Sequence, residues 1–251
     1  MPVWASAALW GGVAGSALLI GAAIGYAVSI PRRLIAAVMA FGAGVLISAL
    51  AFDLMDEAYQ RGGFDSTSIG FVAGAIVYTL ATLAVNRRGA KRRKRSHSQP
   101  TESDDPGSGL ALAIGALVDG IPESIAIGIS MIQGGAVSSV AVAAIFLSNV
   151  PEGLSSAAGM RQAGRSRGYV FAVWGIIAAL SSVASLAGYA VFNRFSPDVI
   201  AGTTAVADGS ILSMLADTMM PEAFAEAHDW AGVITVVGFL AAFALSKHSG
   251  A

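Results

Sequence analysis

The sequence predicts an all-α membrane protein of eight transmembrane helices. The chain of 251 residues is 55% hydrophobic and only 12% charged, whereas soluble domains carry about 25% charged residues. Its apolar runs reach about 20 residues, the length that a helix needs to cross the ~30 Å hydrocarbon core of a bilayer. The polar breaks between the runs are short. These three observations favour a single transmembrane domain over residues 1–251.

Turn or charge signals separate the apolar runs into eight expected spans. The first span begins the chain, and because no charge precedes Arg32, we interpret it as an uncleaved helix rather than a signal peptide. The spans are expected at about 3–28, 34–57, 67–86, 108–131, 136–160, 168–191, 199–221 and 229–246. The breaks fall at 31–33, 60–65, 87–107, 133–135, 161–167, 193–198 and 221–228. Glycine, alanine and serine are frequent inside the spans, which predicts close packing of the helices.

The basic residues predict the orientation of the chain. Of the 15 Lys and Arg residues, 12 fall in the first, third, fifth and seventh breaks. The positive-inside rule therefore places both termini outside and the basic stretch 87–107 in the cytoplasm. The composition of this stretch predicts a flexible loop. The compact loops favour an integral protein of a bacterial inner membrane, although other membranes remain open.

Six carboxylates interrupt the apolar spans, and no Lys or Arg lies within a span to neutralise them. An isolated acid in hydrocarbon costs at least a few kcal/mol. We therefore expect these acids to face a polar interior that a cation occupies. They are Asp53, Asp119, Glu123, Glu152, Asp208 and Asp217.

The fourth and fifth spans carry two variants of one motif, Asp-Gly-Ile-Pro-Glu-Ser over 119–124 and Ser-Asn-Val-Pro-Glu-Gly over 148–153. On a helix, residues four positions apart share a face, so each motif presents its polar side chains together. The two prolines lack an N–H and free the carbonyl groups of Val118 and Leu147. Such helices line ion sites in transporters. The doubled motif therefore favours a cation site over ordinary packing.

At these motifs the chain resembles the ZIP (Zrt/Irt-like) divalent-metal transporters, whose fourth and fifth helices carry His-Asn-x-Pro-Glu-Gly-type segments. Eight helices, outside termini and a variable cytoplasmic loop after the third helix are also that family's plan. The resemblance implies that Glu123, Asn149 and Glu152 are metal ligands in a site midway across the membrane. Asp119 and Ser148 stand where the family usually has His. The sixth span lacks the acid or His that some relatives contribute.

Acids of the second and seventh spans resemble ZIP segments that end in His-x-x-Pro-Glu, with Asp53 and Asp217 at the His position. The resemblance implies a 3+2+3 bundle, in which helices one to three and six to eight are related by pseudo-symmetry. By the predicted orientation, Glu57 lies toward the outside and Glu222 toward the cytoplasm. We expect Asp53 and Asp217 to be further residues of the metal site. Glu57, Asp208 and Glu222 are candidates for an entrance and an exit of the pathway.

The expected function is transport of a divalent metal ion as substrate, without a cofactor. The resemblance favours zinc, whereas an all-oxygen ligand set suits manganese, magnesium or calcium better, with ferrous iron between. No His lies in a span, and the chain has no Cys. We expect the lipid bilayer and the metal ion as partners, with no nucleic acid, while the sequence leaves a homodimer open.

Three other functions remain as alternatives. The first is a proton- or sodium-coupled carrier of another solute, which would use the same acids as relays. The second is an intramembrane enzyme, but neither Gly-x-Ser-x-Gly nor His-Glu-x-x-His is present, so we do not expect catalysis. The third is a metal sensor or a structural membrane protein. Metal-dependent transport would separate these alternatives.

Overall fold

The computed structural model describes residues 1–87, 93–94, 99, 101, 108–132 and 137–249. Every regular element in this part of the chain is a helix, and it contains no strand. The expected all-α fold is therefore confirmed. Six helical segments among the described residues are long and apolar enough to cross a membrane. Segments of this length and hydropathy fit a multi-pass membrane protein.

The helices follow the chain in a simple order, and short irregular helical turns join some of them. The α-helices are α1 (Val3–Ala27), α2 (Arg32–Ala49), α3 (Met55–Asn86), α4 (Ser108–Ser130), α5 (Ser139–Gln162), α6 (Arg167–Phe192), α7 (Pro197–Met214), α8 (Met220–Ala227) and α9 (Ala231–Ser249). Two π-helical turns, η1 (Leu50–Leu54) and η3 (Leu215–Met219), join α2 to α3 and α7 to α8. A 3₁₀ turn, η4 (His228–Trp230), leads into α9.

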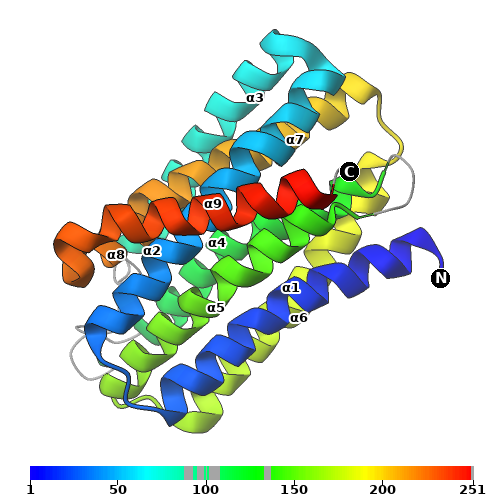
Figure 1. Cartoon of the computed structure of the whole chain (residues 1–251). Helices are drawn as coiled ribbons and strands as arrows, with labels where there is room; N and C mark the ends of the chain where they lie inside the picture. Colours follow the sequence, from blue (N-terminus) through cyan, green and yellow to red (C-terminus); the bar gives the residue numbers. More distant parts are fainter. Residues whose placement is uncertain (88–92, 95–98, 100, 102–107, 133–136, 250–251) are drawn as a thin grey trace.

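Two of the six apolar segments, Arg32–Asn86 and Pro197–His248, are 55 and 52 residues long. This is more than twice the length that a bilayer requires. Each contains a residue with non-helical backbone angles, Gly63 at φ 66° and ψ −175° within α3, and His228 at φ 45° and ψ −123° after α8. The chain folds back on itself at both places (Figure 1). Each of these two segments covers two of the eight expected spans, because helical structure continues on both sides of the bend. The chain therefore shows six apolar helical segments in its described part.

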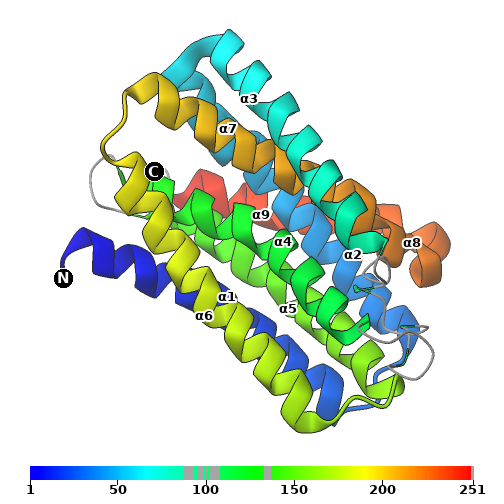
Figure 2. The ribbon, with the colours of Figure 1, turned by 180° about the vertical axis from the view of Figure 1, so that it is seen from behind.

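The long helices lie side by side in a bundle (Figures 1 and 2). α3 packs along α7 and α2 packs along α9, whereas α1 packs along both α5 and α6, and α4 packs along α6. Contacts of α2 with α5 and of α4 with α7 connect the group α2, α3, α7 and α9 to the group α1, α4, α5 and α6. α4 and α5, which carry the two Pro-Glu motifs, therefore lie between the remaining helices.

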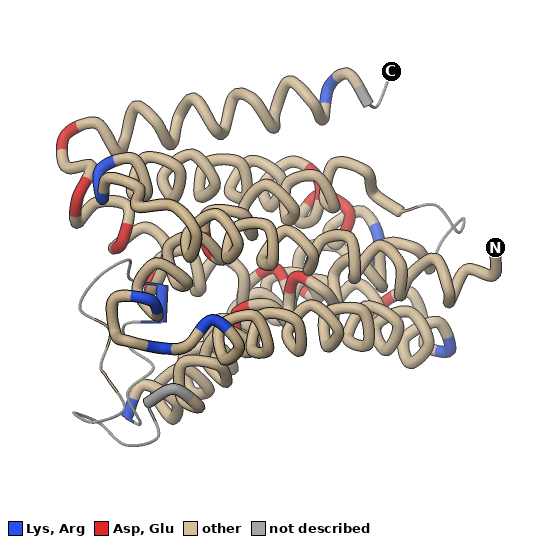
Figure 3. The backbone as a smooth tube through the Cα atoms, turned by 90° about the horizontal axis from the view of Figure 1, so that it is seen from below, with Lys and Arg blue, Asp and Glu red and all other residues tan. Residues whose placement is uncertain are grey.

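The ends of the bundle differ in charge. The start of α1 and the end of α9 lie at one end, and most Lys and Arg residues gather at the opposite end (Figure 3). Acidic residues also occur midway along the bundle. This separation of charge agrees with the positive-inside pattern of the sequence.

Glycine residues bring the backbones of α1 and α5 into contact. A Cβ atom added at Gly21 of α1 would overlap the carbonyl oxygen of Val150, and one added at Gly153 of α5 would overlap that of Leu18. Small residues allow this close approach between helices in lipid. Gly153 directly follows Glu152, so the expected close packing of α1 against α5 occurs at the Pro-Glu motif of α5.

Replacing Gly153 by alanine is expected to destabilise the bundle by about 1–3 kcal/mol, because the new methyl group meets the backbone of α1. The measurement is the thermal unfolding midpoint of the detergent-solubilised protein. Gly175→Ala in α6 is the matched control, since its Cβ meets no atom within 4 Å, and its midpoint is expected to stay unchanged or rise. Equal midpoints for both variants would contradict the role of Gly153.

Candidate cation site

The two motifs occupy the middle of α4 and α5. Pro122 lies within α4 and Pro151 within α5, and both helices continue through their prolines. Each proline still removes one N–H from its helix, which leaves a backbone carbonyl without its usual donor. The motifs are therefore presented on continuous helices, and their side chains project from neighbouring turns.

Three carboxylates of these motifs are almost completely buried. Asp119 is 1% exposed, Glu123 is 2% exposed and Glu152 is 4% exposed. A buried carboxylate requires positive charge and hydrogen bonds around it. The residues or ions that supply this positive charge therefore determine which cations the site can bind.

The chain itself supplies positive charge to the site, so the expectation that no basic side chain would neutralise these acids was wrong. Arg93 is 2% exposed and Lys94 is 3% exposed, and both contact the carboxylates. They belong to the stretch 87–107, which was expected to be a flexible loop and lies mostly outside the described residues. Hydropathy places this stretch in water, but it does not detect two side chains that are drawn inward by buried acids.

Arg93 binds Asp119 through two hydrogen bonds. Its Nε donates to Oδ2 at 2.7 Å, and its Nη2 donates to Oδ1 at 2.8 Å. Tyr78 of α3 also donates to Oδ1 at 2.6 Å and accepts from Arg93 Nη2 at 3.0 Å. Asn86 accepts from Arg93 Nη1 at 3.1 Å. Such two-pronged pairing fixes geometry as well as charge, so Asp119 is held firmly between α3 and Arg93.

Lys94 lies among all three carboxylates. Its Nζ is 3.0 Å from Glu152 Oε2 and 3.5 Å from Asp119 Oδ2, and it interacts electrostatically with Glu123. It also lies 2.9 Å from Met214 Sδ. Burial alone would lower the pKa of Lys94, but Asp119 and Glu152 hold this pKa above its ordinary value. These two carboxylates therefore favour the charged form of the amine.

Glu123 is the one of the three carboxyl groups that forms no ion pair with Arg93 or Lys94 among the described residues. Its Oε1 is buried and has no hydrogen-bond partner among the described residues. Glu123 also lies within electrostatic reach of Glu152 and Asp119. Three formal negative charges face two positive ones, so the cluster retains a preference for further positive charge.

Asn149 and Ser148 are buried beside these acids and donate to backbone groups. Asn149 Nδ2 donates to the carbonyl oxygen of Ala14 in α1 at 3.0 Å, and Ser148 Oγ donates to that of Ile145 at 3.0 Å. With their hydrogens directed to the backbone, both side chains retain oxygen lone pairs that can ligate a cation. The structure therefore brings together Asp119, Glu123 and Glu152 around Lys94, with these two residues on α5.

The acids of the second and seventh spans have other surroundings. Asp53 lies in η1 and accepts from Ser246 of α9 at 3.1 Å. Asp217 lies in η3, where its side chain is exposed. Among the described residues, no contact joins either acid to Lys94. In the same part of the chain no three acidic or histidine side chains, those around Lys94 included, are close enough together to hold a metal ion.

The three entrance and exit candidates differ from one another. Glu57 forms an ion pair with Arg61 at 2.5 Å. Asp208 is completely buried, neither of its oxygens has a hydrogen-bond partner among the described residues, and it lies within electrostatic reach of Glu57. Glu222 of α8 is buried as well. Glu57 and Asp208 therefore form a second acidic position, on the α3 and α7 side of the bundle.

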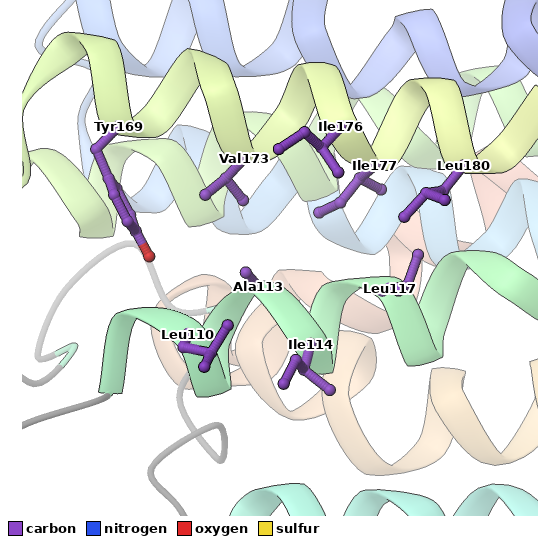
Figure 4. A pocket seen from close by; sticks show the side chains of 9 residues that line it. All are labelled: Leu110, Ala113, Ile114, Leu117, Tyr169, Val173, Ile176, Ile177 and Leu180. Atoms are coloured by element: carbon purple, nitrogen blue, oxygen red, sulfur yellow. The ribbon is translucent and has the colours of Figure 1, made fainter.

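A groove on the outer surface has a different character from the carboxylate cluster. It has a volume of about 320 Å³ and lies between α4 and α6, where residues such as Leu110, Leu117 and Leu180 line it. Figure 4 shows that Tyr169 contributes the one polar atom among the labelled side chains. No carboxylate lines this groove, so it offers a surface for hydrocarbon and no ligand for a cation.

Comparison of this chain with models of known protein families and with curated protein sequences gives no match.

Replacing Arg93 by methionine is expected to destabilise the protein by about 3–5 kcal/mol, because Asp119 stays buried with less positive charge beside it. The double variant Arg93→Met with Asp119→Leu is expected to recover part of this loss, since it removes both charges. Denaturant unfolding in mild detergent measures both effects. Arg194→Met, at an exposed position, is the control and is expected to leave the unfolding midpoint unchanged. An unchanged midpoint for Arg93→Met would contradict the pairing.

Proposed function

We propose that this protein transports divalent metal cations across a membrane. The observation that carries the proposal is a buried cluster in which Asp119 and Glu152 form ion pairs with Lys94 Nζ. Glu123, also buried, lies within electrostatic reach of the same nitrogen. In the described arrangement these carboxylates stand too far apart to ligate one metal ion together, so the proposal requires them to draw in around the ion. They would then supply its negative charge and its oxygen ligands. Asn149 and Ser148 add neutral oxygen ligands from α5.

The ligand chemistry bears on the choice of metal. Carboxylate, amide and hydroxyl oxygens suit manganese and magnesium, and ferrous iron and zinc also accept carboxylates. The resemblance of the Pro-Glu motifs to ZIP transporters adds zinc as the first substrate to test. We therefore propose zinc, with manganese and ferrous iron as further substrates, and no cofactor.

The packing supports a pathway of eight membrane passes with 3+2+3 pseudo-symmetry. If each long segment crosses the membrane twice, with its bend at Gly63 or His228, then α1, α2 and α3 correspond to α6, α7 and α9. Under this pseudo-symmetry the packed pair α3–α7 corresponds to the packed pair α9–α2. The pair α1–α5 likewise exchanges with α6–α4. The turns η1 and η3 also correspond, and each contains one acid, Asp53 or Asp217. π-Helical turns are frequent at functional sites, which supports a role for both positions.

The charge distribution supports the proposed orientation of the pathway. The end that carries most basic residues is the proposed cytoplasmic end, and Glu57 with Asp208 then lies toward the outside. A cation would pass from there to the central carboxylates and leave past Glu222. The grouping of α1, α4, α5 and α6 apart from α2, α3, α7 and α9 supports movement of one helix set against the other.

A proton- or sodium-coupled carrier of another solute is the second candidate. The observation that favours it is Asp208, which is completely buried with no hydrogen-bond partner among the described residues. Intramembrane acids of this kind serve as proton or ion relays. Such a carrier would move its solute without added divalent metal, so the metal requirement of transport distinguishes the two candidates.

The isosteric variants Glu123→Gln and Glu152→Gln are each expected to lower metal flux at least tenfold, because each removes a negative ligand from the central site. The measurement is the initial rate of metal uptake into proteoliposomes. Asp65→Asn, an exposed acid of α3, is the matched control and is expected to retain the wild-type rate. Equal rates in all variants would contradict the assignment of the site.

Wild-type proteoliposomes are expected to take up one or more of Zn²⁺, Mn²⁺, Fe²⁺ and Cd²⁺ faster than protein-free liposomes, because the central carboxylates attract divalent cations. Uptake of each metal is measured separately under the same membrane potential. The absence of flux for all four metals, with folded protein verified, would refute metal transport and favour the coupled carrier.

A further inference from the structure

We propose that Lys94 is an internal cation that competes with the transported metal ion for the central carboxylates. This inference rests on the proposed function, because it names what controls the same site. In this arrangement the basic stretch after α3 places a positive charge of the chain in the position that the substrate needs. The metal ion binds only when the Lys94 ammonium leaves.

Distance makes the two cations mutually exclusive. Lys94 Nζ lies 3.0 Å from Glu152 Oε2 and 3.5 Å from Asp119 Oδ2. A zinc ion would lie about 2.0–2.2 Å from its carboxylate oxygens, inside the space between these atoms. The ammonium would then stand within bonding distance of a like charge, which is strongly unfavourable in a buried site. Metal binding therefore requires that Lys94 withdraws.

The charge balance favours such an exchange. With Arg93 and Lys94 in place, three carboxylates leave one formal negative charge without compensation. If Arg93 stays on Asp119 and a divalent ion replaces Lys94, the formal charges of the cluster cancel. A monovalent ion in the same position would leave the original imbalance. The exchange of Lys94 thus selects for a doubly charged substrate.

Arg93 makes more and shorter polar contacts than Lys94. Arg93 makes two short hydrogen bonds to Asp119 and others to Tyr78 and Asn86. Lys94 is a point charge, with one ion-pair contact at 3.0 Å and a longer one at 3.5 Å. A guanidinium fork is preorganised for a carboxylate, whereas an ammonium on a flexible stem is not. Lys94 is therefore the member of the pair that can leave while Arg93 remains.

The backbone that carries Lys94 is fastened to α5, the helix that carries Glu152. Ser155 Oγ donates to the carbonyl oxygen of Lys94 at 2.5 Å. Gln99 Nε2 donates to the carbonyl oxygen of Arg93 at 3.2 Å and to that of Ser156 at 3.1 Å. Gln99 is itself buried. These bonds keep the ammonium at a high effective concentration beside its carboxylates, so its occupancy is a built feature of the site.

The first experiment compares metal affinity in Lys94→Ala, Arg87→Ala and the wild type, using equilibrium binding of Zn²⁺ and Mn²⁺ to purified protein. Removal of the competitor is expected to lower the apparent Kd by about tenfold or more, since a site that is rarely open shows a weakened affinity. Arg87 is an exposed basic residue of the same stretch, and its variant is expected to bind as the wild type does. An unchanged or higher Kd in folded Lys94→Ala would overturn the proposal.

Lys94→Ala leaves buried carboxylates with less positive charge, so its folding is measured with and without metal. The rise of Tm caused by saturating Zn²⁺ is expected to be larger in Lys94→Ala than in the wild type, because the bound ion then supplies the missing charge and binds more tightly. An equal rise in both proteins would count against the competition.

The outcomes separate this inference from the proposed function. Metal binding with the same Kd in all proteins, together with an equal rise of Tm in the wild type and Lys94→Ala, would overturn the competition and leave transport intact. Failure of both the wild type and Lys94→Ala to bind any metal would overturn the proposed function as well.

Discussion

The pairing of buried carboxylates with positive charge is the constraint on which this structure depends. Asp119, Glu123 and Glu152 lie in a bundle whose remaining core is largely apolar, and each carboxylate there loses the water that would otherwise stabilise it. Arg93 and Lys94 provide the compensation. The stretch between α3 and α4 therefore contributes to the core, although its sequence is among the most polar of the chain.

Much of the fold follows from the sequence alone. Apolar runs of bilayer length identified the long helices, whereas α8 lies in an expected break. The ends of most long helices fall within a few residues of the expected breaks. The exceptions are instructive. At Gly63 and His228 single residues with positive φ reverse the chain, so that helix continues on both sides. Hydropathy counts polar residues in a break and does not reveal whether helical hydrogen bonding persists through it.

The candidate site was foreseen in part. The i,i+4 spacing within the Pro-Glu motifs predicted that Asp119 and Glu123 share a face, and the structure places both beside Glu152. The need for a nearby cation was also predicted from charge alone. Its source was not, because Arg93 and Lys94 look like any other members of a basic run. Asp53 and Asp217 were expected to join this site, but their contacts depend on how the helices pack, which sequence spacing does not determine.

Arg93 also has a mechanical consequence. Its Nε and Nη2 donate to Asp119 of α4, while Nη2 also donates to Tyr78 and Nη1 donates to Asn86, both of α3. α4 packs with α6, whereas α3 packs with α7, so this one side chain fastens together two groups of helices that otherwise pack mainly within themselves. Sliding of one group past the other would have to break these hydrogen bonds or carry both partners along. Arg93 thus ties the relative position of α3 and α4 to the charge pairing at Asp119.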